Sequence, residues 1–260
     1  RPEPQAFWTP QTPLEHWQVD GRFSPAADEA EEAGRWRLDR PIPEAWPISY
    51  GPVRFFARCT PFRHLGFFPE QASQWDFLAA HLGPGRRVRN LVGDTGVASL
   101  IAAAKGAHVT HVDASKKAIG FARQNQTEAG LDAAKIRWIC DDALGFVRRE
   151  ARRGNSYHAI ILDPPKHGRG PDGQIWKLEE GLTSLLSALP AILAPPGDGP
   201  RCVITTVYAV RLSFLALANA LDDALGAAGG RIEAGEMALE QADKRRLLPT
   251  AIFARWQDRP

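Results

Sequence analysis

The sequence predicts an α/β fold in which a parallel sheet carries helices on both faces, with a small β-rich segment in front. Three observations predict it. Strand-like and helix-like runs alternate after about residue 85, glycines follow most of the helix-like runs, and the segment before residue 85 is rich in Pro, Trp and short β-like runs. Regular strand–helix alternation is typical of parallel sheets with crossover helices on both faces.

The chain of 260 residues is long enough for one large domain with an appendage. Residues 1–68 are expected to form the β-rich appendage, because the runs at 36–38 and 53–58 are bounded by Pro or Gly, as strands often are. Residues 69–260 are expected to form the main domain. It should open with a helix over 70–82, which a proline precedes and a Gly-Pro-Gly run ends.

The main domain is then expected to alternate five strands with helices and to close with two more strands. The strands are predicted at 88–91, 108–112, 136–139, 158–162, 202–206, 231–234 and 250–256. The helices are predicted at 97–105, 115–129 and 143–153, in a stretch that ends near 193 after a loop, and at 213–225. Three of these helices are followed by glycine, as C-caps commonly are.

Composition narrows the class of protein. Hydrophobic residues make up 44% and charged residues 24%, which is ordinary for a globular protein, and the net charge of +2 is too small to indicate nucleic acid by itself. No uninterrupted apolar stretch approaches about 18 residues, and the first residues lack the apolar core of a signal sequence, so neither a membrane span nor secretion is expected. Cys59, Cys140 and Cys202 are too widely spaced for a disulfide framework or a zinc site. We therefore expect no metal and a reducing cytoplasm.

A glycine-containing turn follows the first predicted strand of the main domain. Gly93-Asp94-Thr95-Gly96 lies where a strand passes into a helix, and glycine there lets the backbone approach a ligand closely. A tight turn with no ligand explains this motif equally well when it is taken alone.

Acidic residues end the next two strands. Roughly 20 residues separate Gly93 from Asp113, the spacing at which a carboxylate accepts hydrogen bonds from ribose hydroxyls. Asp113 could instead cap the helix entered at Ser115. The turn and the acid together favour a nucleoside ligand. Because G-x-G-x-x-G is absent, the cradle for the NAD pyrophosphate is incomplete, and a nucleoside without phosphates fits better. Asp141-Asp142-Ala143 ends the third strand, where an acid could bind an adenine amino group or Asp142 could cap the next helix.

The fourth strand ends in Asp163-Pro164-Pro165-Lys166. Two prolines fix the backbone and remove two donors, so the loop is stiff and its carbonyl oxygens can face a substrate. Open α/β sheets bind ligands at this edge. Asp163 beside those carbonyls could orient a nucleophilic amino group. A rigid turn after a buried strand is the alternative, and it accounts less easily for both prolines.

Asp-Pro-Pro-Lys followed by His-Gly-Arg-Gly-Pro at 163–171 resembles the Asp-Pro-Pro-Lys-aromatic-Gly motif of class I methyltransferases, which have a Rossmann-like sheet. The most similar group is the bacterial large-subunit ribosomal RNA methyltransferase family, in a version without its PUA domain. The resemblance covers roughly residues 60–256. Further matching runs lie at 66–71, 95–99, 112–118, 125–126 and 141–143.

The resemblance implies S-adenosyl-L-methionine as methyl donor. By position, the glycine turn would face its methionine part, Asp113 its ribose and Asp141 or Asp142 its adenine. It implies that the cofactor-binding residues are Gln71, Gly93, Asp94, Thr95, Gly96, Asp113, Ala114, Ser115, Asp141, Asp142, Ala143 and Asp163. It likewise implies that the residues at the reacting centre are Asp163, Pro164 and Lys166.

Two positions depart from the family. It usually carries an aromatic pair near Val92 and Asp94, and an aromatic residue where this chain has His167. The extra carboxylate of Asp94 could meet the ammonium or sulfonium of the donor, or it could weaken binding. A side chain that stacks on a base would do so less well as His167.

The acceptor is expected to be a nitrogen or oxygen atom, because methylation at cytosine carbon needs a cysteine nucleophile and residues 205–208 contain none. RNA, bound through its phosphates, is the expected partner, and the resemblance suggests ribosomal RNA. The basic residues that could contact phosphate are Arg148, Arg149, Arg152, Arg153, Lys166, Arg169, Lys177, Lys244, Arg245 and Arg246. The four arginines at 148–153 are explained slightly better as solvated side chains that favour the dipole at a helix end. The alternatives are a methyltransferase for a protein or small molecule, and a non-catalytic nucleic-acid-binding module that keeps the fold.

Overall fold

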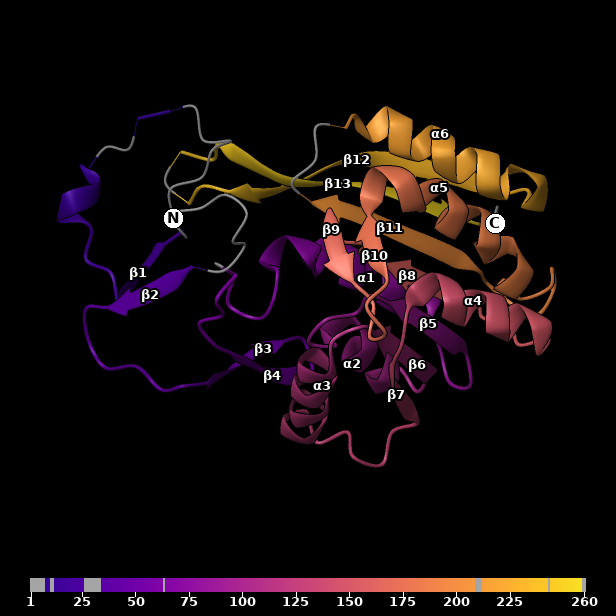
Figure 1. Ribbon diagram of the computed structural model, residues 1–260, viewed down its shortest axis with the longest axis horizontal. Helices are drawn as coiled ribbons and strands as arrows, with labels where there is room; N and C mark the ends of the chain where they lie inside the picture. Colours follow the sequence, from indigo (N-terminus) through magenta and orange to yellow (C-terminus); the bar gives the residue numbers. More distant parts are fainter. Residues whose placement is uncertain are drawn as a thin grey trace.

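The computed structural model describes residues 8–9, 12–25, 34–62, 64–208, 212–242 and 244–258. A mixed seven-stranded sheet organises these residues, with the strand order β12-β13-β11-β8-β5-β6-β7 (Figure 1). The first residues, on which the expectation about a signal sequence rests, lie outside the described part.

Five of the seven strands are parallel, and the last two are antiparallel additions at one edge. The parallel strands are β5 (Arg87–Leu91), β6 (His108–Asp113), β7 (Ile136–Cys140), β8 (Ala159–Leu162) and β11 (Cys202–Tyr208). The antiparallel strands are β12 (Arg231–Glu240) and β13 (Leu247–Gln257). Every residue of β8 is buried, as expected for a central strand that both layers cover.

Helices cover both faces of the sheet. One face packs against α4 (Ala143–Arg152), α5 (Leu178–Ala188) and α6 (Phe214–Leu225) in a single apolar cluster. The other face carries α1 (Ala72–His81) and α2 (Val97–Ala104), and α3 (Lys116–Glu128) packs on α2. This arrangement confirms the predicted α/β sheet with helices on both faces. Four short 3-10 helices complete the described helices: η1 (Leu14–His16), η2 (Pro69–Gln71), η3 (Leu189–Ile192) and η4 (Gly226–Ala228).

Two β-hairpins precede the sheet, and they confirm that the N-terminal segment is β-rich (Figure 1). The first joins β1 (Gly21–Ser24) to β2 (Arg35–Leu38), and the second joins β3 (Trp46–Tyr50) to β4 (Val53–Ala57). The sequence predicted β2 and β4 but neither partner strand. The second hairpin packs on α2 and α3 and shares an apolar cluster with α1, so its strands bury their apolar side chains against the main domain. The boundary near residue 68 stays a prediction.

A third hairpin, β9 (His167–Arg169) with β10 (Ile175–Lys177), interrupts the connection between β8 and α5. The sequence predicted only a loop here, because strands of three residues carry too few side chains to show a periodicity. Among the described residues, no helix is long and apolar enough to cross a membrane.

Candidate active site

Parallel pairing brings the ends of four strands to one edge of the sheet. Leu91 at the end of β5 is in register with Val112 of β6 and Leu162 of β8, and Asp113 is in register with Cys140 of β7. The loops that follow these strands therefore start at the same edge. β11 runs three residues beyond the register of Leu162, so Thr206 and Tyr208 also lie at this level.

The turn after β5 has an unusual backbone. Val92 has φ of 57° and Asp94 has φ of 46°, and Gly96, also left-handed at 84°, is the N-cap of α2. A β-branched residue with positive φ is a conformational outlier, and such strain persists mainly at ligand-binding and catalytic positions. Gly93 is required for a different reason: a Cβ there would lie 2.4 Å from Cε1 of buried His111.

Gly93→Ala is expected to destabilise the protein by about 1–3 kcal/mol, because the methyl group would push on a buried, hydrogen-bonded side chain. Nδ1 of His111 lies 3.0 Å from the Ser99 hydroxyl, so the ring has little room to move. The matched control is Gly120→Ala on α3, where nothing lies within 4 Å of the new Cβ and stability should rise by about 0.5–1 kcal/mol. Urea unfolding of both variants tests this; equal effects would contradict it.

Asp113 holds two loops together. Its Oδ2 accepts from the Asp94 amide at 2.9 Å and its Oδ1 from the Ser115 amide at 2.8 Å. The cap of α3 is Ser115, whose hydroxyl accepts from the Ala118 amide at 3.2 Å, so Asp113 is not the helix cap. Burial raises the pKa of Asp113, and the two amide donors partly offset this.

Three carboxyl groups gather at this edge. Burial, together with the nearby charges of Asp113 and Asp163, raises the pKa of Asp94 to about 7, although the Thr95 amide opposes the rise. Asp94 therefore lies within electrostatic reach of both of the other acids. The structure thus places Asp113 and Asp163 at one edge of the sheet, as the sequence predicted.

Asp163 borders a group of buried polar atoms that lack partners. Burial raises the pKa of Asp163 to about 6, although the facing side chains of Gln71 and Thr206 oppose the rise. Among the described residues, Oδ1 of Asp163, Oγ1 of Thr206 and the hydroxyl of Tyr208 are buried without a hydrogen-bond partner. Folded proteins rarely leave such atoms unpaired, so this cluster is a candidate binding site for a polar ligand.

Trp176 fixes the loop that carries Asp163. Its indole Nε1 donates to the carbonyl oxygen of Pro165 at 2.7 Å, and the Leu178 amide donates to the carbonyl oxygen of Lys166 at 2.9 Å. The ring also covers Gly181, where a Cβ would lie 2.4 Å from the indole. Pro164 is buried and Lys166 is exposed. The Asp-Pro-Pro-Lys segment is therefore rigid, with a charged side chain on its outer side.

The acids after β7 already have partners. Asp142 caps α4, accepting from the Gly145 amide at 2.6 Å, which confirms the capping interpretation. Asp141 forms an ion pair with Arg149. Ala143 begins α4 and is half-buried. A role of this segment at an adenine stays a prediction.

Two more of the predicted cofactor-binding residues have structural contacts of their own. The Thr95 hydroxyl donates to the carbonyl oxygen of Gly66 at 2.6 Å, which attaches the segment before η2 to the glycine turn. Ala114, next to Asp113, accepts from Cys140 Sγ at 3.4 Å through its carbonyl oxygen. Thr95 therefore positions backbone, and its side-chain oxygen is not free.

Sequence reasoning missed several residues of the site. Thr206 and Tyr208 were considered only because their stretch lacks cysteine, although their place at the end of a central strand could have indicated them. His111 and Asn90 lie under the glycine turn, and each has one buried polar atom without a partner among the described residues. No sequence signal singles out Trp176, whose role depends on the hairpin that the sequence did not predict.

The chain is similar to solved methyltransferases. An S-adenosylmethionine-dependent methyltransferase from Agrobacterium tumefaciens is 42% identical, with a TM-score of 0.91 over 99% of this chain and 83% of that one. A second such structure, from Streptococcus mutans, has a TM-score of 0.68 at 18% identity over 86% of this chain and 58% of that one. The second shows the fold alone. No family profile matches the chain.

Two curated relatives are named ribosomal RNA large subunit methyltransferase I. The protein from Aeromonas hydrophila is 34% identical over 102 residues, which are 39% of this chain and 25% of that protein. The protein from Yersinia pseudotuberculosis is 32% identical over 126 residues, 48% and 31% of the two chains. The match thus spans less than a third of each relative.

The residues present fit S-adenosylmethionine, which carries a sulfonium and an ammonium group. Asp94, Asp113 and Asp163 supply negative charge at one edge; burial raises the pKa of each, and no cationic side chain of the described residues forms an ion pair with them. The strained turn around Gly93, which has no room for a side chain on its inner side, suits close approach of the backbone to a ligand. The fold, the site and the similarity to the Agrobacterium enzyme agree: this chain belongs to the S-adenosylmethionine-dependent methyltransferases.

Proposed function

We propose that this enzyme methylates RNA, and specifically ribosomal RNA, at a nitrogen or oxygen atom. One observation carries the RNA assignment: Lys166 and Arg169 are exposed in the segment that directly follows Asp163 and its unpartnered polar cluster, and neither forms an ion pair with another described residue. Free cations beside a buried polar site suit a substrate with phosphates around the reacting base. The names of the two curated relatives support the same substrate.

The proposed division of the site follows the order of the strands. The turn from Gly93 to Gly96 holds the methionine part of the cofactor, and Asp94 pairs with its positive charge. Asp113, with Ala114 and Ser115, holds the ribose. The segment from Asp141 to Ala143 borders the adenine, and Gln71 closes the site from the segment that enters the domain. Two of these assignments have support from contacts: Asp94 and Asp113 are joined by a hydrogen bond, and Gln71 faces Asp163.

The bound cofactor supplies a methyl group on a sulfonium, a good leaving group that needs little acid catalysis. The protein's task is alignment, which can contribute much of the rate acceleration. Asp163 is proposed to accept a hydrogen bond from the acceptor through its unpartnered Oδ1 and so to orient the nucleophile. Pro164 keeps the loop stiff, and Lys166 contacts the substrate from the outer side.

A nitrogen or oxygen acceptor is proposed because residues 205–208, at the end of β11, contain no cysteine and neither Cys140 nor Cys202 is placed to attack a base. Cys202 begins β11, at the end of the strand opposite Tyr208, and burial raises the pKa of its thiol to about 12. The thiol of Cys140 donates to a backbone carbonyl. Neither fits a nucleophile in the cluster at Asp163. The three free cysteines agree with a reducing compartment, and we propose the cytoplasm.

A methyl-transfer assay with tritiated S-adenosylmethionine tests the function. Purified protein is incubated separately with total RNA, ribosomal subunits, protein and small metabolites. Label is expected in RNA, most strongly in large-subunit ribosomal RNA, and nuclease digestion followed by chromatography should assign it to a nitrogen- or oxygen-methylated nucleoside. Label only in protein or in metabolites would reject the RNA substrate. No label anywhere, together with no heat on titration with S-adenosylmethionine, would favour the non-catalytic module.

A further inference from the structure

Four aromatic rings form a continuous stack that begins at the surface and ends at the site. We call Phe62, His64, Phe68 and Tyr208 the aromatic column. The ring centroids of Phe62 and His64 are 6.3 Å apart with planes at 13°. Those of His64 and Phe68 are 5.0 Å apart at 29°, and those of Phe68 and Tyr208 are 5.0 Å apart at 42°. These spacings lie in the range at which aromatic rings attract one another.

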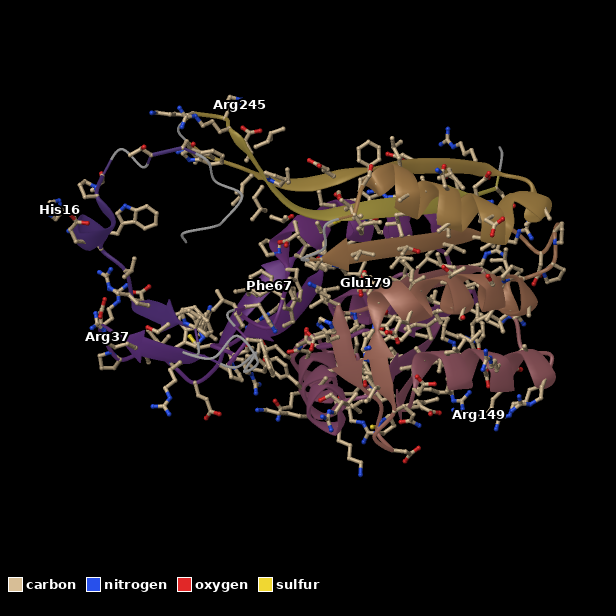
Figure 2. All side chains as sticks on the ribbon, turned by 45° about the horizontal axis from the view of Figure 1, so that its top comes forward. His16, Arg37, Phe67, Arg149, Glu179 and Arg245 are labelled. Atoms are coloured by element: carbon tan, nitrogen blue, oxygen red, sulfur yellow. The ribbon has the colours of Figure 1, made fainter. Side chains whose placement is uncertain are left out.

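The two ends of the aromatic column differ. Tyr208 is the inner end: its hydroxyl is one of the unpartnered buried atoms, and the charge of Asp163 helps to raise its pKa. Phe62 is the outer end and is 55% exposed. Figure 2 shows Phe67, the neighbour of Phe68 in the chain, between the N-terminal hairpins and the main sheet. The aromatic column therefore connects the proposed acceptor position with the surface on the side of the N-terminal segment.

Hydrogen bonds hold the column in place. The Thr60 hydroxyl and amide donate to the His64 carbonyl oxygen at 2.8 and 3.2 Å, and the Gly66 amide donates to Nδ1 of His64 at 3.1 Å. The Gly66 carbonyl in turn accepts from the Thr95 hydroxyl. These bonds attach His64 and the segment that carries it to the glycine turn. The other three rings of the column are half-buried, whereas Phe62 is 55% exposed, so the face of Phe62 is available to a ligand.

We propose that the aromatic column is a stacking surface for unpaired bases of single-stranded RNA next to the nucleotide that is methylated, with one base lying on Phe62. This inference rests on the proposed function and names the form of its substrate. Single-stranded nucleic acids are bound by aromatic rings in series and by cations along the backbone. Lys166 and Arg169 supply exposed positive charge at the same edge. A lone small molecule at Asp163 would use the inner ring and would leave the outer rings without a purpose.

The test uses a 12-nucleotide single-stranded RNA with one 5-iodouridine, the same RNA annealed into a duplex, and S-adenosylhomocysteine. Phe62→Ala is expected to raise the Kd for the single strand about fivefold or more, the loss typical of one stacked base. Phe62→Tyr should stay within about twofold, because it keeps the aromatic face. The matched control is Leu215→Ala on α6, which removes another largely exposed apolar side chain (60% exposed) and should change nothing. Irradiation should crosslink the iodouridine to Phe62 or His64 in the wild type, and the duplex should bind more weakly.

The outcomes separate this inference from the proposed function. If the wild type methylates RNA while Phe62→Ala keeps its Kd and its KM for RNA, the stacking surface is rejected and the function stands. If single-stranded RNA binds and crosslinks as expected but no RNA is methylated, RNA stacking on the column stands, whereas the function and the place of the column beside a methylated nucleotide are rejected. An equal loss of RNA affinity in Leu215→Ala would assign the effect to folding and overturn the proposal. A parallel loss of S-adenosylhomocysteine binding in Phe62→Ala would do the same.

Discussion

Asp163→Asn is expected to lower kcat for methyl transfer by roughly 10²–10⁴-fold, the usual contribution of a positioned acid or base, while the Kd for S-adenosylhomocysteine changes by less than about threefold. The unpartnered Oδ1 of Asp163 is buried in a stiff loop, so its hydrogen bond to the acceptor is the interaction that the variant weakens. Asn keeps the shape of the side chain and removes the charge. Asp163→Ala should lose at least as much activity. Single-turnover rates and calorimetry measure the two effects separately.

The pH dependence of kcat/KM is a second test of the same variant. Burial raises the pKa of Asp163 to about 6, so kcat/KM should rise with pH until about 6 if the ionised form orients the acceptor. That acid limb should be absent in Asp163→Asn. The matched control is Asp172→Asn, an exposed aspartate in the turn between β9 and β10, which should behave as the wild type. An equal loss of cofactor binding and of turnover in Asp163→Asn would show that this residue holds the cofactor rather than the acceptor.

Asp94→Asn is expected to raise the stability of the protein without cofactor and to weaken cofactor binding. In the folded protein, burial and the charges of Asp113 and Asp163 raise the pKa of Asp94 from 3.8 to about 7. Because the pKa of this carboxyl group is higher in the folded than in the unfolded protein, its contribution to the free energy of unfolding is most favourable below about pH 4. That contribution is lost as pH rises through about 7. At pH 8 the wild type therefore contains an ionised, poorly solvated carboxylate that Asn does not have, and the variant should be more stable.

The size of this effect follows from the pKa. The rise from 3.8 to about 7 sets an upper limit of about 4 kcal/mol. Asp94 is half-buried, so screening by water reduces the electrostatic penalty of its charge. We therefore expect the variant to gain about 1–2 kcal/mol in the free energy of unfolding, or roughly 2–8 °C in Tm. Thermal scans of wild type and variant at pH 5 and pH 8 measure it: the advantage should be clear at pH 8 and small at pH 5. A variant less stable than the wild type at pH 8 would contradict the argument.

Cofactor affinity should move the other way. The variant loses the carboxylate that pairs with the positive charge of S-adenosylmethionine, and such a charge-assisted contact is worth about 1.5–3 kcal/mol, so Kd should rise roughly tenfold or more. Asp94→Ala separates the effect of the charge from the effect of the backbone conformation. The φ of 46° at this position suits Asp and Asn better than Ala, so Ala should lose the stability that Asn gains. Unchanged affinity in Asp94→Asn would place the positive charge of the cofactor elsewhere.

Much of the fold followed from local patterns. The predicted strands of the main sheet match observed strands within a few residues, because apolar runs bounded by glycine and proline mark buried strands without knowledge of their partners. The last two strands are longer than predicted, since the pairing of β12 with β13 continues as far as Glu240 and Leu247. The partner strands β1 and β3 were missed for different reasons: β1 has no clear alternation, and Pro47 inside β3 argues against a strand. Each is a strand through its hairpin.

The sequence by itself determined the sheet, its carboxyl edge and the acids Asp113 and Asp163 that meet there, because these depend on the order of strands and on residues directly after them. Only the tertiary structure decided which polar groups have partners: Asp142 and Thr95 are engaged by the protein, whereas Thr206 and Tyr208 keep unpaired atoms beside Asp163. The aromatic column also belongs to the tertiary structure. Its rings come from residues 62–68 and from residue 208, and no periodicity along the chain can register a contact between segments so far apart, because packing rather than local conformation joins them.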